Sequence, residues 1–442
     1  MFWKLFLIIG IVLMHKQVIN FLRKLETKGE NVMFVICNDK TRVPVKVWLE
    51  KEGQLEENCL EQAYHLSQLP FLHKWVCLMP DTHAGKGMPI GGVIAAKDVI
   101  IPNAVGVDIG CGMDFIPTNI RVEEIREVQT GNGTMIQAMI GNIMREIPLN
   151  MERYREPQES RVLDLAKQEL EKYEADAELL PLIEDGYYQV GSLGGGNHFI
   201  ELQEDQEGYL CIMIHSGSRH LGKSVCDHFH KKARELNRRW YSEVKEEYHL
   251  SFLPVQTEEG QQYIRWMNLS MDYAFENRAR MLEKTCRIVS ELIEKHTGLA
   301  VEFGEEINCH HNYAALEHHY HANVWVHRKG ATRVRKGEMA VIPGAMGSYS
   351  YVVEGKGNPE TFCSSSHGAG RNYSRSGAVR EFSVEKVMVD LKEQGVVLGK
   401  RKKNDVAEEC RFAYKDIDQV MAQQIDMVTP VRKLKTVGVV KG

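Results

Sequence analysis

The 442-residue sequence predicts a single α/β domain in which strands and amphipathic helices are interspersed. Two observations predict this class. Apolar, β-branched runs alternate along the chain with segments whose apolar residues recur at helical spacing. Polar, glycine-rich motifs are also spread from residue 81 to residue 371, and no Pro/Ser-rich linker, internal repeat or low-complexity tract separates them. One domain therefore fits the chain better than several modules.

The expected elements follow one another in a mixed order. Alternating or β-branched apolar residues predict strands, which we place at residues 34–39, 43–49, 75–79, 90–101, 99–107, 210–216 and 434–440. Helical spacing predicts helices, which we place at residues 56–69, 223–248, 261–295, 383–393 and 416–424. Residues 120–185 are mostly charged and helical in pattern, and we expect them to form a peripheral face without chemistry of its own.

The composition is that of an ordinary globular protein, with 43% hydrophobic and 26% charged residues. A net charge of −5 gives no global basic field, so a nucleic-acid partner would have to use local basic patches. The ten cysteines are spread singly without a C-x-x-C pair, which excludes a disulfide framework or a zinc ribbon. We therefore expect a cytoplasmic protein, because unpaired thiols are typical of a reducing compartment.

Residues 1–32 differ from the rest of the chain. Their apolar run at residues 5–14 is too short to span a bilayer, which takes about 20 residues. No small-residue cleavage site follows the run, as a secretory signal would require. We interpret Met33 as the natural start and residues 1–32 as an extension outside the domain, and we expect no membrane association.

The stretch at residues 104–113, AVGVDIGCGM, brings Asp108 and Cys111 three positions apart among glycines. Glycines allow the backbone to turn tightly, so the two side chains can point to one place. A carboxylate and a thiol aimed together suit a transition metal. The alternative is a buried structural cysteine beside a turn-forming aspartate, which is the better interpretation for an isolated D-x-x-C.

Three histidines downstream favour the metal site over the structural cysteine. His198 follows a glycine turn in GGGNHFIEL, His215 ends the apolar strand LCIMIHS, and His311 lies in EINCHHNY. With Asp108 and Cys111 they make five candidate ligands, more than one tetrahedral site needs. A thiolate can bridge two ions, so a binuclear centre of Mn²⁺, Zn²⁺ or Fe²⁺ is indicated, which would suit phosphoryl transfer.

His367 lies in a second polar motif, SSSHGAGR. The small residues around it allow a phosphate or a nucleotide to approach the ring, and Arg371 can pair with a phosphate. Such a histidine is either a nucleophile that forms a phosphoramidate or a general acid, and the spacing favours neither. The sequence has no P-loop and no dinucleotide fingerprint, so a nucleotide would have to be held in another way.

Together, these motifs resemble the RtcB family of RNA-splicing ligases from about Met33 to Gly442. The motifs occur in family order: PDTHAGKG, VGVDIGCGM, GGGNHFIEL, HSGSR, EEINCHHNY, HRKGA, IPGAMG, SSSHGAGR, AYKDID and the terminal KG. The resemblance implies an RtcB-like catalytic domain at residues 33–442, with a core of stacked β-sheets surrounded by helices. Residues 1–32 lie outside it.

The resemblance also implies a reaction. Two Mn²⁺ ions would be held by Asp108, Cys111, His198, His215 and His311, with the cysteine shared. His367 would attack the α-phosphate of GTP to give a guanylated histidine, and the guanylate would pass to an RNA 3′-phosphate. A 5′-hydroxyl would then attack that end and release GMP. A 2′,3′-cyclic phosphate would first be opened to the 3′-phosphate.

The family's contacts with GTP map onto a larger set: Asn197, His198, Phe199, Ile200, Glu201, His311, Asn312, Pro343, Gly344, Ala345, Met346, Ser350, His367, Gly368, Ala369, Gly370 and Lys441. Glu201 can accept hydrogen bonds from guanine N1–H and the exocyclic amine, and Lys441 can donate to guanine O6. Many members have serine where this chain has Ala345. A lost hydrogen bond is worth about 0.5–1.5 kcal/mol, so we expect weaker or altered GTP affinity.

The implied partner is RNA with 3′-phosphate or 2′,3′-cyclic phosphate and 5′-hydroxyl ends, in tRNA splicing, tRNA repair or ribosomal RNA repair. Among the basic clusters, Arg219 and residues 328–335 are the candidates for phosphate contacts. We expect a monomer, and the need for an archease-like activator stays open. Two alternatives are a binuclear metallophosphoesterase acting on RNA ends and a non-catalytic RNA-repair scaffold. Only the ligase requires covalent guanylation.

Overall fold

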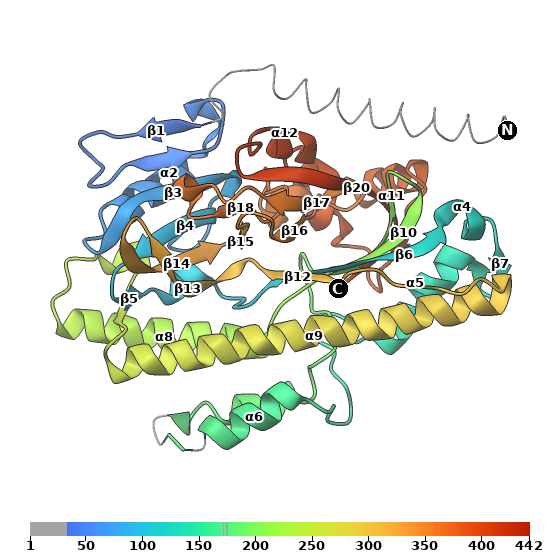
Figure 1. Cartoon of the computed structure of the whole chain (residues 1–442), viewed down its shortest axis with the longest axis horizontal. Coiled ribbons are helices and arrows are strands. Elements are labelled where there is room, and N and C mark those ends of the chain that lie inside the picture. Colours follow the sequence, from blue (N-terminus) through green and yellow to red (C-terminus); the bar gives the residue numbers. More distant parts are fainter. Residues whose placement is uncertain (1–32, 171, 174–175) are drawn as a thin grey trace.

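The computed structural model of the chain describes residues 33–442 apart from 171 and 174–175. Two β-sheets form the centre of the molecule, and the long helix α9 (Glu258–Thr297) runs along one side of it (Figure 1). The predicted mixed α/β (α+β) class is confirmed. The proposed extension at residues 1–32 lies outside the described residues.

The smaller sheet has six strands. Their spatial order is β1 (Phe34–Ile36), β2 (Val45–Val47), β3 (Leu72–His83), β4 (Ile90–Ala96), β14 (Ala322–Lys329) and β13 (Asn312–His319). Neighbouring strands are antiparallel except β2 and β3, which are parallel. Strands from the first hundred residues therefore pair with strands that lie more than two hundred residues later in the chain.

The larger sheet has eight strands. Along its main path the order is β12 (Ile307–His310), β6 (Gly112–Arg121), β10 (Tyr209–Ser216), β9 (Phe199–Asp205), β20 (Val428–Lys441), β17 (Tyr349–Gly355) and β16 (Met339–Ile342). Strand β19 (Val397–Gly399) pairs with β20 in parallel. The two end strands, β12 and β16, lie close to each other, so the sheet curls back toward itself.

Helices and short strand pairs surround the two sheets. The helices are α2 (Glu57–Ser67), α3 (Pro102–Val105), α4 (Val122–Ile125), α5 (Met135–Glu146), α6 (Arg161–Leu170), α7 (Pro181–Gly186), α8 (Arg219–Arg239), α9, α10 (Arg375–Glu381), α11 (Val384–Glu393) and α12 (Ile417–Ala422). The short pairs are β5 (Val99–Ile100) with β11 (Leu253–Pro254), β7 (Gln129–Thr130) with β8 (Gly133–Thr134), and β15 (Ala331–Arg333) with β18 (Ser364–Ser366).

The sheets are stacked through a shared hydrophobic core. Val93 and Val326 of the smaller sheet share one buried cluster with Ile342 and Val353 of the larger sheet. Burial of these apolar side chains on both facing surfaces stabilises the stack. The predicted core of stacked sheets with helices outside is thus confirmed.

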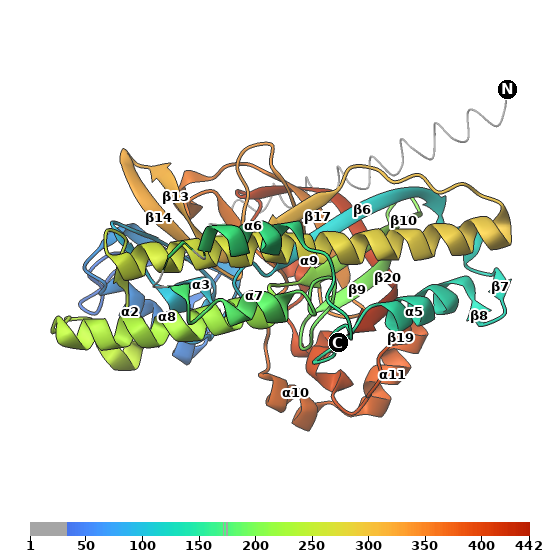
Figure 2. The same cartoon turned by 90° about the horizontal axis from the view of Figure 1, so that it is seen from below.

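Helix α9 is the longest helix described and packs against α8 and α5. Its N-cap Thr257 accepts a hydrogen bond from Gly260 N–H at 3.1 Å, and Gly298 ends it in the left-handed conformation (φ +76°). Its 40 residues extend about 60 Å. Figure 2 shows α8 beside one part of α9, and α5 packs against the other part.

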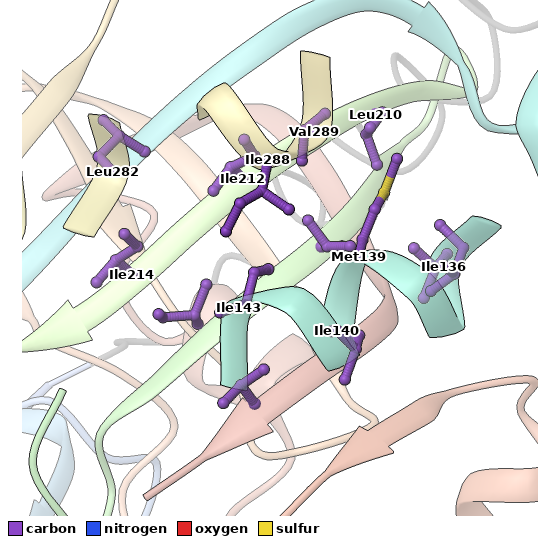
Figure 3. Close-up of a cluster of buried hydrophobic side chains, with 14 of the residues drawn as sticks. Ile136, Met139, Ile140, Ile143, Leu210, Ile212, Ile214, Leu282, Ile288 and Val289 are labelled. Atoms are coloured by element: carbon purple, nitrogen blue, oxygen red, sulfur yellow. The ribbon is translucent and has the colours of Figure 1, made fainter. Parts of the chain in front are cut away.

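One core cluster shows how α9 is held. Ile212 and Ile214 of β10 lie between α5, which contributes Ile140 and Ile143, and α9, which contributes Ile288 (Figure 3). These side chains are 0–3% exposed. The helix that crosses behind the larger sheet is therefore anchored to it by close aliphatic packing.

Some predicted elements were wrong in extent. Residues 99–107 do not form one strand, because Pro102 begins the short helix α3 and Gly106 ends it at φ +104°. Proline suits the first turn of a helix, where its missing N–H is not needed. The helix expected at 223–248 begins at Arg219 and ends at Arg239. Residues 120–185 begin as strand β6 and then form several short helices.

Within the described part of the chain, none of the helices combines the length and the apolar character needed to cross a membrane.

The core around Ile212 gives a stability prediction. Ile212 is fully buried, so Ile212→Ala should lower the free energy of unfolding by about 2–5 kcal/mol through lost burial and a cavity. The exposed Leu316, at 58% exposure, is the control, and Leu316→Ala should change stability by less than about 0.5 kcal/mol. Urea denaturation of both variants checks this, and equal losses would contradict the packing described here.

Candidate active site

The order of strands in the larger sheet brings the predicted metal ligands together. Cys111 directly precedes β6, His215 lies near the end of β10, His198 directly precedes β9, and His311 directly follows β12. These four strands are neighbours, and the register places His215 opposite Phe199 and Gly112 opposite both Ser216 and His310. The four ligand residues therefore meet at one end of the sheet.

The ligand atoms lie within a few ångströms of one another. Cys111 Sγ is 3.5 Å from His198 Nε2 and 3.3 Å from His215 Nε2. His215 Nε2 is 3.3 Å from His311 Nε2, and Asp108 Oδ2 is 3.0 Å from His198 Nε2. All five predicted residues converge in two groups of three that share the thiol. They are Cys111, His215 and His311, and Asp108, Cys111 and His198.

The surroundings of this cluster suit metal ions. His198 Nδ1 donates to the Leu193 carbonyl at 3.0 Å, which leaves the Nε2 lone pair directed at the cluster. The Asp108 carboxylate lies against Gly217, where a Cβ atom would come within 2.2 Å of its Oδ1. Imidazole, carboxylate and thiol donors arranged in this way fit a pair of transition-metal ions.

Electrostatics favour the metal-binding forms of the imidazoles. Burial lowers the pKa of His215 and His311 well below the usual histidine value, so both rings are neutral. Burial and then the Asp108 carboxylate raise the pKa of the Cys111 thiol, and the charge of Arg278 opposes this shift. A bound cation would bring the thiol to its thiolate form.

His367 lies beside this cluster with its orientation fixed. Its Nδ1 is 2.7 Å from Asp81 Oδ2, and its backbone N–H donates to the same oxygen at 3.1 Å. When Nδ1–H donates to this buried carboxylate, the lone pair of Nε2 stays free, as a nucleophile requires. The His367 and His311 ring centres are 4.7 Å apart.

A cavity of about 240 Å³ connects His367 with the ligand cluster. Its walls include Asp108, Cys111, His215 and His311 and most of the residues predicted to contact a nucleotide: Asn197, Phe199, Asn312, Pro343, Gly344, Ala345, Met346, Gly368, Ala369, Gly370 and Lys441. The cavity is therefore walled by both predicted sets of residues, the ligands and the nucleotide contacts.

Comparison with known proteins agrees with this arrangement. The family model described as tRNA-splicing ligase RtcB matches residues 62–442. The chain belongs to the RtcB family. It is 36% identical over 405 residues to the RNA-splicing ligase RtcB of Escherichia coli (strain K12). This alignment covers 90% of this chain and 97% of that protein.

Two further relatives extend the match to other lineages. The tRNA-splicing ligase RtcB of Thermococcus kodakarensis is 32% identical over 469 residues, covering 91% of this chain and 95% of the relative. The RNA-splicing ligase RtcB of Mycobacterium tuberculosis is 32% identical over 440 residues, and the alignment covers 86% of this chain and 100% of the relative. The predicted family resemblance is confirmed.

Four residues from the predicted nucleotide set do not line the cavity: His198, which belongs to the ligand cluster, and Ile200, Glu201 and Ser350. Glu201 Oε2 accepts hydrogen bonds from Gln203 Nε2 at 2.7 Å and Thr436 Oγ1 at 3.0 Å. Ser350 Oγ accepts from Gly344 N–H at 3.1 Å. Ile200 packs its side chain into the hydrophobic core, because it alternates with Phe199 and Glu201 along β9.

The structure adds residues that sequence reasoning missed. Asp81 lies in the quoted motif PDTHAGKG and Lys415 in AYKDID, but neither motif indicated a partner. Lys415 Nζ donates to the carbonyls of Pro80 and Thr82 at 3.0 and 2.7 Å, so it holds the backbone on both sides of Asp81. The carboxylate that orients His367 is thus itself fixed.

Glu409 is a second missed residue, and it lies in no recognisable motif. Its Oε2 accepts from Tyr414 Oη at 2.6 Å and lies 3.5 Å from Lys441 Nζ, and its Oε1 accepts from Arg371 Nη1 at 3.1 Å. All four side chains line the cavity. Glu409 therefore holds three polar groups of the cavity wall in place.

Of the residues predicted to contact RNA, Arg328 is excluded by the structure and Arg219 is not. Arg328 is fully buried and paired with Glu317, so it is not available to an RNA phosphate. The pairing of β13 with β14 brings these two residues together, which the basic cluster in the sequence does not reveal. Arg219 begins α8 and donates to Ser192 Oγ at 3.0 Å. Its use by RNA stays a prediction.

The shared thiol gives a test of the cluster. Cys111→Ala should weaken the binding of both metal ions by at least about tenfold, because Sγ belongs to both groups. Elemental analysis after gel filtration and titration with Mn²⁺ would measure this. Cys309→Ala is the matched control, since this cysteine lies on the neighbouring β12 outside both groups. Unchanged metal content in Cys111→Ala would refute the assignment.

Proposed function

We propose that this protein is an RNA ligase that uses GTP and Mn²⁺ to join RNA 3′-phosphate or 2′,3′-cyclic phosphate ends to 5′-hydroxyl ends. The observation that carries the proposal is the oriented His367, which Asp81 holds beside the cluster of five candidate metal ligands, four of which line the same cavity as His367. The names of the relatives, RNA-splicing and tRNA-splicing ligase, support RNA as the substrate.

The first step forms a covalent nucleotide. His367 Nε2 attacks the α-phosphorus of GTP, an N–P bond forms, and the bond to the pyrophosphate oxygen breaks so that pyrophosphate leaves. Positive charge develops on the imidazole as its lone pair is used. The Asp81 carboxylate accepts the Nδ1–H hydrogen bond and stabilises that charge.

Two transfers complete the reaction. An oxygen of the RNA 3′-phosphate attacks the guanylate phosphorus and the N–P bond to His367 breaks. The oxygen of the 5′-hydroxyl then loses its proton and attacks the RNA phosphorus, which releases GMP and forms a 3′–5′ phosphodiester. Two Mn²⁺ ions held by Asp108, Cys111, His198, His215 and His311 would supply charge neutralisation at the attacking and leaving oxygens.

We assign guanine recognition to two buried residues of opposite charge, Lys441 in the cavity wall, where it is paired with Glu409, and Glu201 behind that wall. Lys441 Nζ lies near the Phe199 ring, and the register pairs Lys441 with Phe199 at the start of β9. Glu201 is on the same strand, two residues further along. A carboxylate that accepts two N–H groups and an ammonium that donates to O6 match guanine, whereas adenine offers the opposite pattern at these positions.

The alternatives leave part of this site without a use. A metallophosphoesterase would need the metal ligands but not the pair of His367 and Asp81, and a scaffold would need neither. We also propose a cytoplasmic monomer acting in tRNA splicing or RNA repair. The ten cysteines, all free thiols, support a reducing compartment.

The proposal predicts covalent guanylation. Incubation with α-labelled GTP and Mn²⁺ should label the wild-type protein on a denaturing gel, and His367→Ala should remove the label. His318→Ala is the control, because this ring is exposed and pairs with Asn323 away from the cavity. No label on a wild-type protein with both metal ions bound would instead favour the phosphoesterase.

Guanine binding should depend on pH through Glu201. Burial raises the pKa of Glu201 to about 7, with Lys441 opposing the shift, so the carboxyl is protonated below that pH. Only the ionised form accepts both guanine N–H groups. GTP affinity should therefore fall as pH is lowered through 7, approaching tenfold for each pH unit below it.

The control for this prediction is Glu201→Gln, whose amide does not titrate. Protonation of GTP and of the histidines affects both proteins, so the ratio of their GTP dissociation constants isolates the contribution of Glu201. Parallel pH profiles for wild type and variant would show that Glu201 does not contact the base in this way.

A further inference from the structure

Two consecutive polar residues in the middle of α9, Asn277 and Arg278, are fully buried behind the metal-ligand cluster. Neither lines the cavity and neither is a ligand. Their side chains reach the backbone segments that carry the ligands, so both residues act on the cluster from outside it.

The guanidinium of Arg278 donates four hydrogen bonds to three segments of the chain. Nε and Nη2 donate to Asn308 Oδ1 at 2.9 and 2.7 Å, and Nη1 donates to the carbonyls of Gly110 and Ser216 at 2.9 and 3.0 Å. His310 Nδ1 lies 3.2 Å from Nη2 and donates to the same Gly110 carbonyl at 2.9 Å. A planar fork with five N–H groups can reach several segments at once, which a lysine cannot do.

Three of the segments that Arg278 holds carry one ligand each. Gly110 precedes Cys111, Ser216 follows His215, and Asn308 lies on β12, which ends directly before His311. These three ligands are the members of one of the two metal groups. A single side chain therefore fixes the spacing between the three strand ends on which that group depends.

Asn277 holds the segments of the other group. Its Oδ1 accepts from the backbone N–H groups of Gly191 and Ser192 at 2.8 and 3.1 Å, and its Nδ2 donates to the Gly217 carbonyl at 3.0 Å. Ser192 leads to Leu193, the hydrogen-bond partner of His198, and Gly217 lies against the Asp108 carboxylate. Asn277 thus supports Asp108 and His198.

The burial of Arg278 is not explained by an ion pair. Among the described residues no carboxylate lies within 4 Å of its guanidinium; the link to an acid runs through Asn308 Nδ2, which donates to Asp114 Oδ2 at 2.9 Å. Burial and then Glu306 raise the pKa of Asp114 to about 8, so this carboxyl is largely protonated at neutral pH. Burying a charge without a contacting counterion is costly, which points to a use for its hydrogen bonds.

We propose that Asn277 and Arg278 are positioning residues of a binuclear metal centre, Arg278 for the group of Cys111, His215 and His311 and Asn277 for Asp108 and His198. The inference deepens the proposed function and rests on its metal centre. It assigns each member of a buried dipeptide to one of the two ions.

The test measures metal binding directly. Mn²⁺ dissociation constants and the electron paramagnetic resonance spectrum of the loaded protein, which differs between a coupled pair and an isolated ion, would be recorded for Arg278→Met and Asn277→Ala. Each variant should weaken one ion by about 10- to 100-fold and replace the coupled spectrum by that of an isolated ion. Arg287→Met, an exposed arginine of the same helix, is the control and should match wild type.

Double variants identify which ion each residue serves. Arg278→Met should add little to His311→Ala, because that group has already lost a ligand, but should have its full effect on top of His198→Ala. The pattern should reverse for Asn277→Ala. Arg278→Lys keeps the charge but loses the planar guanidinium, so it should weaken binding of the same ion as Arg278→Met does. Wild-type affinity in Arg278→Lys would contradict the role of the guanidinium.

Folding is monitored separately by thermal unfolding of the metal-free proteins. If Arg278→Met does not fold, Asn308→Ala tests the same role, since it removes the acceptor of two guanidinium N–H groups on a half-buried residue. Folded variants with wild-type constants and spectra would overturn the proposal, as would a wild-type protein that binds no Mn²⁺. Two bound ions without labelling of His367 would reject the ligase while leaving the positioning roles intact.

Discussion

The site depends on one constraint, the side-by-side order of β12, β6, β10 and β9 in the larger sheet. Each of these strands begins or ends next to a ligand residue, so the hydrogen-bond register sets the distances within the cluster. A slip of one residue would turn His215 to the opposite face and move the core residue Ile214 out of its cluster. The same apolar alternation that stabilises the sheet therefore fixes the geometry of the ligands.

The polar groups around the cavity are held by several partners each. Asp81 accepts two hydrogen bonds from His367 while Lys415 fixes its neighbours, and Glu409 binds Arg371, Tyr414 and Lys441. In a buried site a polar group with many partners has one favourable orientation, because each alternative would leave a donor or acceptor unpaired. The cavity wall is thus preorganised for the ligand that it binds.

The sequence predicted those features of the site that short, local motifs encode. The five ligands and His367 lie in short glycine-rich motifs. The structure brings the five ligands into one cluster, and four of them line a cavity together with His367. Asn277 and Arg278 lie inside an ordinary amphipathic helix, where only the three-dimensional packing shows what they contact. The prediction of a strand at residues 99–107 was wrong because Pro102 and Gly106 outweighed its β-branched residues. The prediction that Arg328 contacts RNA was wrong because strand pairing brings its partner Glu317 to it.

The strand order of the larger sheet also bears on how the chain folds. Strand β6 pairs with β12 almost two hundred residues later, and β9 pairs with β20 more than two hundred residues later. Closing such long loops before their contacts form is entropically costly, so sheets of this kind fold slowly. A collapsed intermediate can contain α9 and the hairpin of β9 and β10, which carries His198 and His215, before β6 and β12 bring Cys111 and His311 beside it. The complete cluster therefore forms late in folding, and a metal ion bound by all of its members would stabilise the finished sheet rather than start its formation.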